Sequence, residues 1–134
     1  MLDADTNPLP DIDVEGLNHV VIEVDDLEAA RVFYTDGLGF VESGQARWPG
    51  IDGGVVLNCA KDQHLVLVAG KNPIDLKDTG VHFAFRVGLE ARKKIAASLG
   101  HQGIETFTYK EDNPCEEANP FYFFDPFGNR VQLV

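Results

Sequence analysis

An internal repeat is the feature that most restricts how this chain can fold. Residues 17–24 and 81–87 are both extended and rich in valine, and each is followed by a helical segment that begins Leu-Glu-Ala. Each copy also contains one histidine, His19 or His82, five residues before the valine that closes the segment. A repeated strand-helix unit with a histidine in the same register predicts two related modules, each contributing part of a site.

The remaining pattern extends each copy into a βαβββ module. The two helices are expected after Asp25-Asp26, ending at Gly37-Leu-Gly39, and over residues 89–99. The sequence predicts one α+β domain at residues 16–134, with modules at 16–70 and 80–134, after an acidic N-terminal arm at 1–15. The expected strands are 17–24, 40–43, 55–59 and 64–68 in the first module, and 81–87, 104–108, 121–124 and 130–134 in the second.

Composition excludes several classes of protein. The 134 residues are enough for one domain with its own core, and no apolar run approaches the ~20 residues of a membrane span. A net charge of −11 argues against nucleic acid as a partner. The two cysteines show no bridging or zinc spacing, which fits a reducing cytoplasm. No nucleophile elbow, phosphate loop or dinucleotide fingerprint is present, so metal chemistry or ligand binding remains.

Alternation along the strands assigns a face to each histidine. In the first strand Val20, Ile22 and Val24 form an apolar face, and His19 and Glu23 lie on the other. The second module repeats this parity, with His82, Ala84 and Arg86 opposite its apolar face and Gln132 opposite Val131 and Leu133. A polar surface carrying His19, His82 and Gln132 is therefore the expected site. His64 is either a fourth member or a surface residue that caps its strand.

Three stretches resemble a known family. They are the segment from Leu17 to Leu27, the Phe33-Tyr34 pair followed by Gly37-Leu-Gly-Phe40, and the closing segment from Phe121 to Val134. On these motifs the chain resembles the vicinal oxygen chelate superfamily, which includes glyoxalase I, bleomycin-resistance proteins, fosfomycin-resistance proteins and extradiol dioxygenases. The resemblance covers residues 16–134.

The resemblance implies a fold and a metal. The two βαβββ modules would form a U-shaped, partly open mixed sheet around a central groove, and the chain would form a homodimer. The groove would hold a divalent ion, such as zinc, nickel, iron or manganese, that chelates adjacent oxygens of a small substrate. The ligand positions carried over are His19, His64, His82 and Gln132. Family members usually have glutamate at the last position, so this chain lacks the only anionic ligand.

Further site residues and one alternative function follow. Glu23 is the candidate for the catalytic base, because it shares the parity of His19. Trp48 in a Gly-rich loop, Arg86 and Tyr122 are candidates for contact with the substrate. The leading prediction is a metal-dependent enzyme of the glyoxalase or dioxygenase type. The alternative is a metal-free protein that binds a small molecule, such as an antibiotic, as bleomycin-resistance proteins do.

Overall fold

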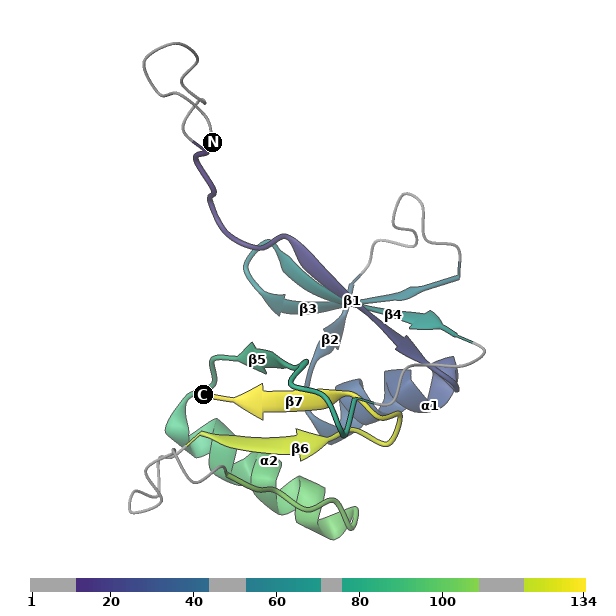
Figure 1. The fold of residues 1–134 in the computed structure, drawn as a ribbon, viewed down its shortest axis with the longest axis vertical. Helices are drawn as coiled ribbons and strands as arrows, with labels where there is room; N and C mark the ends of the chain where they lie inside the picture. The colour runs from purple at the N-terminus through teal and green to yellow at the C-terminus, as the bar shows by residue number, and fades with distance from the viewer. Residues whose placement is uncertain (1–11, 44–52, 71–75, 109–119) are drawn as a thin grey trace.

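The computed structural model describes residues 12–43, 53–70, 76–108 and 120–134, and their strands form two sheets (Figure 1). One sheet has four strands in the order β1-β4-β3-β2, and the other has three in the order β5-β7-β6. The strands are β1 (His19–Val24), β2 (Val41–Glu42), β3 (Val55–Ala60), β4 (Gln63–Ala69), β5 (Phe83–Phe85), β6 (Phe121–Phe124) and β7 (Arg130–Leu133).

Each sheet joins a parallel and an antiparallel pair. In the first sheet β1 runs parallel to β4, and β3 pairs antiparallel with both β4 and β2. In the second sheet β5 runs parallel to β7, and β6 pairs antiparallel with β7. The same order of connections therefore occurs twice, and β1 and β5, which carry or adjoin the two histidines, are both edge strands.

The first helix is divided in two. Asp26 caps α1 (Leu27–Val32), where its Oδ1 accepts a hydrogen bond from the backbone N–H of Ala29 at 3.0 Å. The segment that follows, η1 (Phe33–Gly37), is a single π-helical turn. Gly39 then adopts φ +86°, a conformation that favours glycine, so the expected end of the helix is confirmed.

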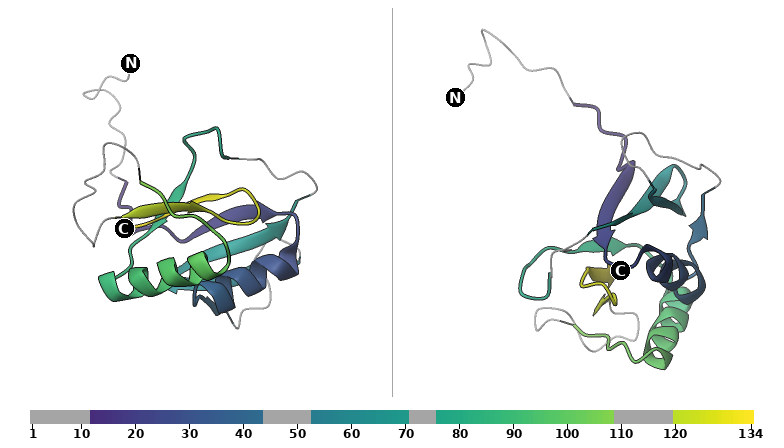
Figure 2. Two further views of the ribbon diagram at one scale, coloured as in Figure 1. Left: turned by 90° about the horizontal axis from the view of Figure 1, so that it is seen from below. Right: turned by 90° about the vertical axis from the view of Figure 1, so that its right-hand side faces the viewer.

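The second helix, α2 (Leu89–His101), lies on the same side of the sheets as α1, as the left view of Figure 2 shows. It ends two residues later than expected, before Gly103 at φ +75°. The Ser98 hydroxyl donates to the carbonyl oxygen of Gly37 at 3.0 Å. This contact joins the helical layers of the two modules.

The core lies between the helices and one face of each sheet. Val24, Leu65 and Leu67 of the first sheet and Phe123 and Val131 of the second are fully buried there. The predicted alternation is confirmed, because the histidine-bearing face of β1 is exposed while Ile22 and Val24 are buried. Among the described helices, neither is long and apolar enough to cross a membrane.

The expected α+β fold of two related modules is confirmed, with two differences in the second module. The strand predicted at 81–87 is limited to β5, so His82 lies just before it. The strand predicted at 104–108 is reduced to a single bridge, in which Phe107 and Tyr122 exchange backbone hydrogen bonds of 2.9 and 2.8 Å. The Phe107 ring stacks on the rings of Tyr122 and Phe124, with centroids 5.7 and 5.5 Å apart. Side-chain stacking therefore holds this segment where a longer ladder was expected.

Candidate functional site

On the first sheet, His19 and His64 lie side by side. They are register partners on the parallel strands β1 and β4, so both side chains point away from the core. The Nδ1 atom of His19 lies 2.7 Å from Oδ1 of Asn18. Because an amide oxygen only accepts hydrogen bonds, Nδ1 of the neutral ring carries the proton and Nε2 carries the lone pair.

On the second sheet, His82 and Gln132 occupy the equivalent non-core face. His82 directly precedes β5, and Gln132 pairs with Ala84 of β5 and with Tyr122 of β6. The Nδ1 atom of His82 lies 2.9 Å from the carbonyl oxygen of Gly80, and its ring packs edge-on against Tyr122 with centroids 5.4 Å apart. His82 is thus held in the same tautomer as His19, by a backbone acceptor.

Strand register shows that the two halves of the predicted ligand set are not equivalent. Continuing the β5-β7 register by one residue places His82 beside Arg130, so Arg130 is the counterpart of His64. By the same register Gln132 corresponds to Val66, which is fully buried. The first module therefore presents a valine where the second presents an amide.

Within one chain, His19 and His82 line different cavities. His19 and His64 line a small one of about 70 Å³ with Ala84 and Phe85. His82 lines a larger one of about 320 Å³ with residues 20–23 of β1. Across residues 12–43, 53–70, 76–108 and 120–134, no three His, Cys, Asp or Glu side chains gather closely enough to hold a metal ion. The four-ligand site stays a prediction; His19 and His64 share one cavity, and His82 lines another.

The other predicted site residues have varied surroundings. Glu23 shares the face of His19, as expected, and lines the same cavity as His82. Arg86 is exposed just beyond β5. Tyr122 is only 8% exposed, because it lies between His82 and Phe107, so its side chain supports His82 directly. Trp48 lies outside the described residues.

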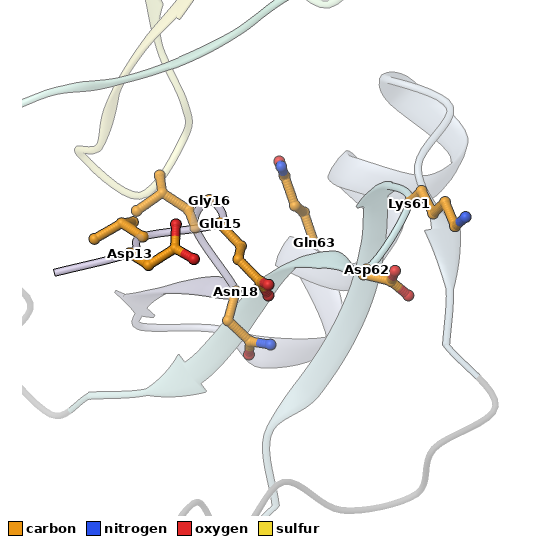
Figure 3. A pocket seen from close by; sticks show the side chains of 9 residues that line it. Asp13, Glu15, Gly16, Asn18, Lys61, Asp62 and Gln63 are labelled. Atoms are coloured by element: carbon orange, nitrogen blue, oxygen red, sulfur yellow. The ribbon is translucent and has the colours of Figure 1, made fainter. Parts of the chain in front are cut away.

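A further cavity adjoins that of His19 and His64 but has no histidine among the described residues of its wall. It has a volume of about 490 Å³ and is lined by residues 13–18 and by the turn between β3 and β4, at 61–63. Figure 3 shows its carboxylates, Asp13, Glu15 and Asp62, with Lys61 in the same lining. Neither His19 nor His82 belongs to its wall. No histidine in the described part of the chain lines this cavity, so its carboxylates have no imidazole beside them for metal binding or proton transfer.

A buried polar network joins the two modules, and sequence reasoning missed it. The Tyr34 hydroxyl donates to Oδ2 of Asp125 at 2.6 Å, and Nδ2 of Asn129 donates to the same oxygen at 3.0 Å. Asn129 Nδ2 also lies 3.3 Å from the carbonyl oxygen of Glu23. Burial raises the pKa of Asp125, while the hydrogen bond from Tyr34 opposes this shift. The Asp-Pro-Phe-Gly-Asn segment at residues 125–129 thus fixes β1 against the second sheet.

Cys59, which lines the cavity of His19 and His64, is not a candidate nucleophile. Desolvation by burial raises the pKa of its thiol to about 11. Since the thiolate is the reactive form, Cys59 is almost entirely protonated near neutral pH. His19 and His64 are the remaining candidates for metal binding among the described residues that line this cavity.

Comparison with known proteins identifies the family. Residues 16–133 match the model of the Glyoxalase/Bleomycin resistance protein/Dioxygenase superfamily. The chain belongs to this superfamily. The predicted resemblance to the vicinal oxygen chelate group is thereby confirmed.

Individual members of the superfamily are similar over most of the chain. The glutathione transferase FosA of Serratia marcescens is 29% identical over 123 residues, which cover 90% of this chain and 80% of FosA. A glyoxalase family protein from Bacillus anthracis is 26% identical with a TM-score of 0.70, covering 93% of this chain and 97% of that one. The fosfomycin resistance protein FosX from Listeria monocytogenes, in complex with Mn(II) and sulfate, is 18% identical with a TM-score of 0.65, covering 90% and 89%. The last of these shows a shared fold.

Proposed function

We propose that this superfamily member is a metal-dependent enzyme that acts on a small substrate with adjacent oxygens. The observation that carries the proposal is the orientation of two imidazoles, since Nδ1 of both His19 and His82 faces a carbonyl oxygen at 2.7 and 2.9 Å. Metal-binding histidines characteristically donate their second ring N–H to such an acceptor, which directs the other nitrogen toward the ion. The same ring nitrogen is thus held at both repeats, by a side-chain amide at His19 and by a backbone carbonyl at His82.

The donor set fits a divalent transition metal. His19, His64 and His82 would supply imidazole nitrogens and Gln132 an amide oxygen, a combination that suits zinc, nickel, iron or manganese. The Mn(II) in the FosX complex supports a metal in this fold. Because all four donors are neutral, the bound ion would keep its full charge, which weakens its retention and strengthens its attraction for an anionic substrate.

Such an ion polarises a substrate oxygen and stabilises negative charge that develops on it. The residues of this chain orient the donors. Asn18 and Gly80 hold the tautomers of His19 and His82, and the Tyr122 ring limits rotation of His82. Glu23 would serve as the base, because it shares a cavity with His82.

We further propose that two copies of the chain complete the site. His19 and His82 line different cavities of one chain, so a second copy is the simplest source of the missing donors. The non-core face of the first sheet carries exposed apolar side chains, with Val21 42% and Val41 65% exposed. A cytoplasmic homodimer is therefore part of the proposal, and its mass in solution can be measured by light scattering.

A metal-free binding protein is the second candidate. It is favoured by the separation of His19 and His82 into two cavities within one chain. In that case the groove would bind a small molecule through its apolar walls, and the imidazoles would act only as hydrogen-bonding groups. The two candidates differ in whether purified protein holds a metal.

Elemental analysis of protein purified without chelator or affinity metal tests the proposal. We expect near-stoichiometric zinc, nickel, iron or manganese, and at least a tenfold weaker affinity in His19→Ala and in His82→Ala. His101→Ala is the matched control, because His101 is exposed at the end of α2. Absence of metal even after reconstitution would reject the enzyme. A substrate screen would begin with fosfomycin and glutathione, as the names of FosA and FosX suggest.

Gln132→Glu is expected to raise the affinity for divalent metal by at least about tenfold, because it adds a negative charge beside the ion. Competition with a fluorescent chelator measures the change. Ala97→Glu adds the same charge at an exposed position of α2 and serves as the control. An unchanged affinity in Gln132→Glu would place Gln132 outside the ligand set.

A further inference from the structure

The cavity between β1 and the start of β5 has the character of a ligand pocket. Its volume of about 320 Å³ lies at the lower end of the usual range for small-molecule sites. Most of its wall is aliphatic or aromatic, and the polar groups are few. Glu23, His82 and Asn129 supply them, while Ile22, Val81 and Phe83 are among the apolar residues.

Glu23 is the charged group that distinguishes this cavity. Among the described residues that line it, Glu23 is the only carboxylate, and there is no lysine or arginine. In the described part of the chain, the Glu23 carboxylate has neither a hydrogen bond nor an ion pair. A carboxylate beside apolar walls without a cationic neighbour is complementary to a cation.

The backbone of Glu23 is bonded to the second module, and its side chain lies over Gly70. A Cβ atom at Gly70 would come within 2.8 Å of Oε2 and 3.1 Å of Cδ of Glu23. The carbonyl oxygen of Glu23 lies 3.3 Å from Nδ2 of Asn129, which is itself bonded to Asp125. Gly70 therefore makes room for the carboxylate, and Asn129 ties its backbone to the second module.

We propose that this cavity binds a small organic ammonium ion, with its charged group at Glu23 and its alkyl part against the apolar wall. The net charge of −11 would raise the local concentration of such cations. Because His82 belongs to the same cavity, the substrate of the proposed enzyme would carry an ammonium group near its chelating oxygens. Only this last step rests on the proposed function.

Titration of the metal-free protein with n-butylammonium chloride, followed by NMR chemical shifts, tests the binding. The isosteric alcohol 1-butanol provides the neutral comparison. We expect the ammonium to bind about tenfold more tightly, as a charge-assisted hydrogen bond would provide. Equal affinity for the two probes, or shift changes away from residues 20–23 and 81–83, would overturn the proposal.

Two pairs of variants assign the preference to Glu23. Glu23→Gln should abolish the preference for the ammonium, whereas Glu105→Gln removes the same charge from an exposed position outside the cavity and should retain it. Gly70→Ala should weaken ammonium binding by displacing the carboxylate without removing it. Gly100→Ala, where nothing lies within 4 Å of an added Cβ, is its control. Retention of the preference in Glu23→Gln would reject the assignment.

The outcomes separate this inference from the proposed enzyme. Ammonium binding by a protein that never takes up metal would support the pocket and reject the enzyme. Metal binding without any preference for the ammonium would support the enzyme and reject the ammonium pocket.

Discussion

Replacing Asp125 by alanine is expected to lower the free energy of unfolding by about 3–5 kcal/mol. Its carboxylate is 3% exposed and accepts four hydrogen bonds. The donors are the Tyr34 hydroxyl at 2.6 Å, the Asn129 N–H at 2.8 Å, and Asn129 Nδ2 and the Phe127 N–H at 3.0 Å each. Alanine would leave these donors without their acceptor, and three of the four belong to the buried residues Tyr34 and Asn129.

Urea unfolding followed by circular dichroism measures this loss. Tyr34→Phe is the matched variant, because it removes one donor and leaves the carboxylate with three, so a loss of about 1 kcal/mol is expected. If Asp125→Ala cost no more than Tyr34→Phe, the network would not join the modules as described. A fall in stability should also disturb the cavity at Glu23, whose carbonyl oxygen is bonded to Asn129.

Phe123→Ala is expected to lower the free energy of unfolding by a similar amount, about 3–5 kcal/mol, because it leaves a cavity between the modules. Phe123 of β6 is fully buried, and its ring centroid lies 6.4 Å from that of Phe33 in η1. The packing thus joins a strand of the second module to a helix of the first. Thermal and urea unfolding of the same variant provide two independent measurements.

Phe121→Ala provides the comparison for Phe123→Ala. Phe121 points to the same side of β6 but is only partly buried, so a smaller loss is expected. Equal losses at the two positions would show that burial between the modules does not decide the effect. A larger loss at Phe121 would contradict the described packing of β6.

Local patterns predicted the elements of this fold well, because they depend on neighbouring residues. The alternation in β1, the Asp26 cap and the stop at Gly39 all appear where they were expected. The strand predicted at 104–108 did not form as a ladder, and the first helix continues as a π-helical turn. Both differences occur where contacts with another element, at Tyr122 and at α2, replace local preference.

The candidate site was predictable only in part. Parity placed His19 and Glu23 on the non-core face of the first module and His82 and Gln132 on that of the second, and the resemblance implied that the histidines and Gln132 bind a metal. Neither could show that Gln132 corresponds to a buried valine of the first sheet, since this depends on strand register. The contact between Gly70 and the Glu23 side chain could not be predicted either, because the two residues are 47 positions apart in the sequence.

The sequence by itself determined the repeat, the two modules and the residue types available on each non-core face, since these follow from periodicities of two and 3.6 residues. Tertiary structure alone decided which of those residues share a cavity. Glu23 shares a cavity with His82, and Tyr34 donates a hydrogen bond to Asp125, 91 positions away in the sequence. Such pairings depend on how the two sheets pack, and a local sequence pattern does not predict the packing of one module on the other.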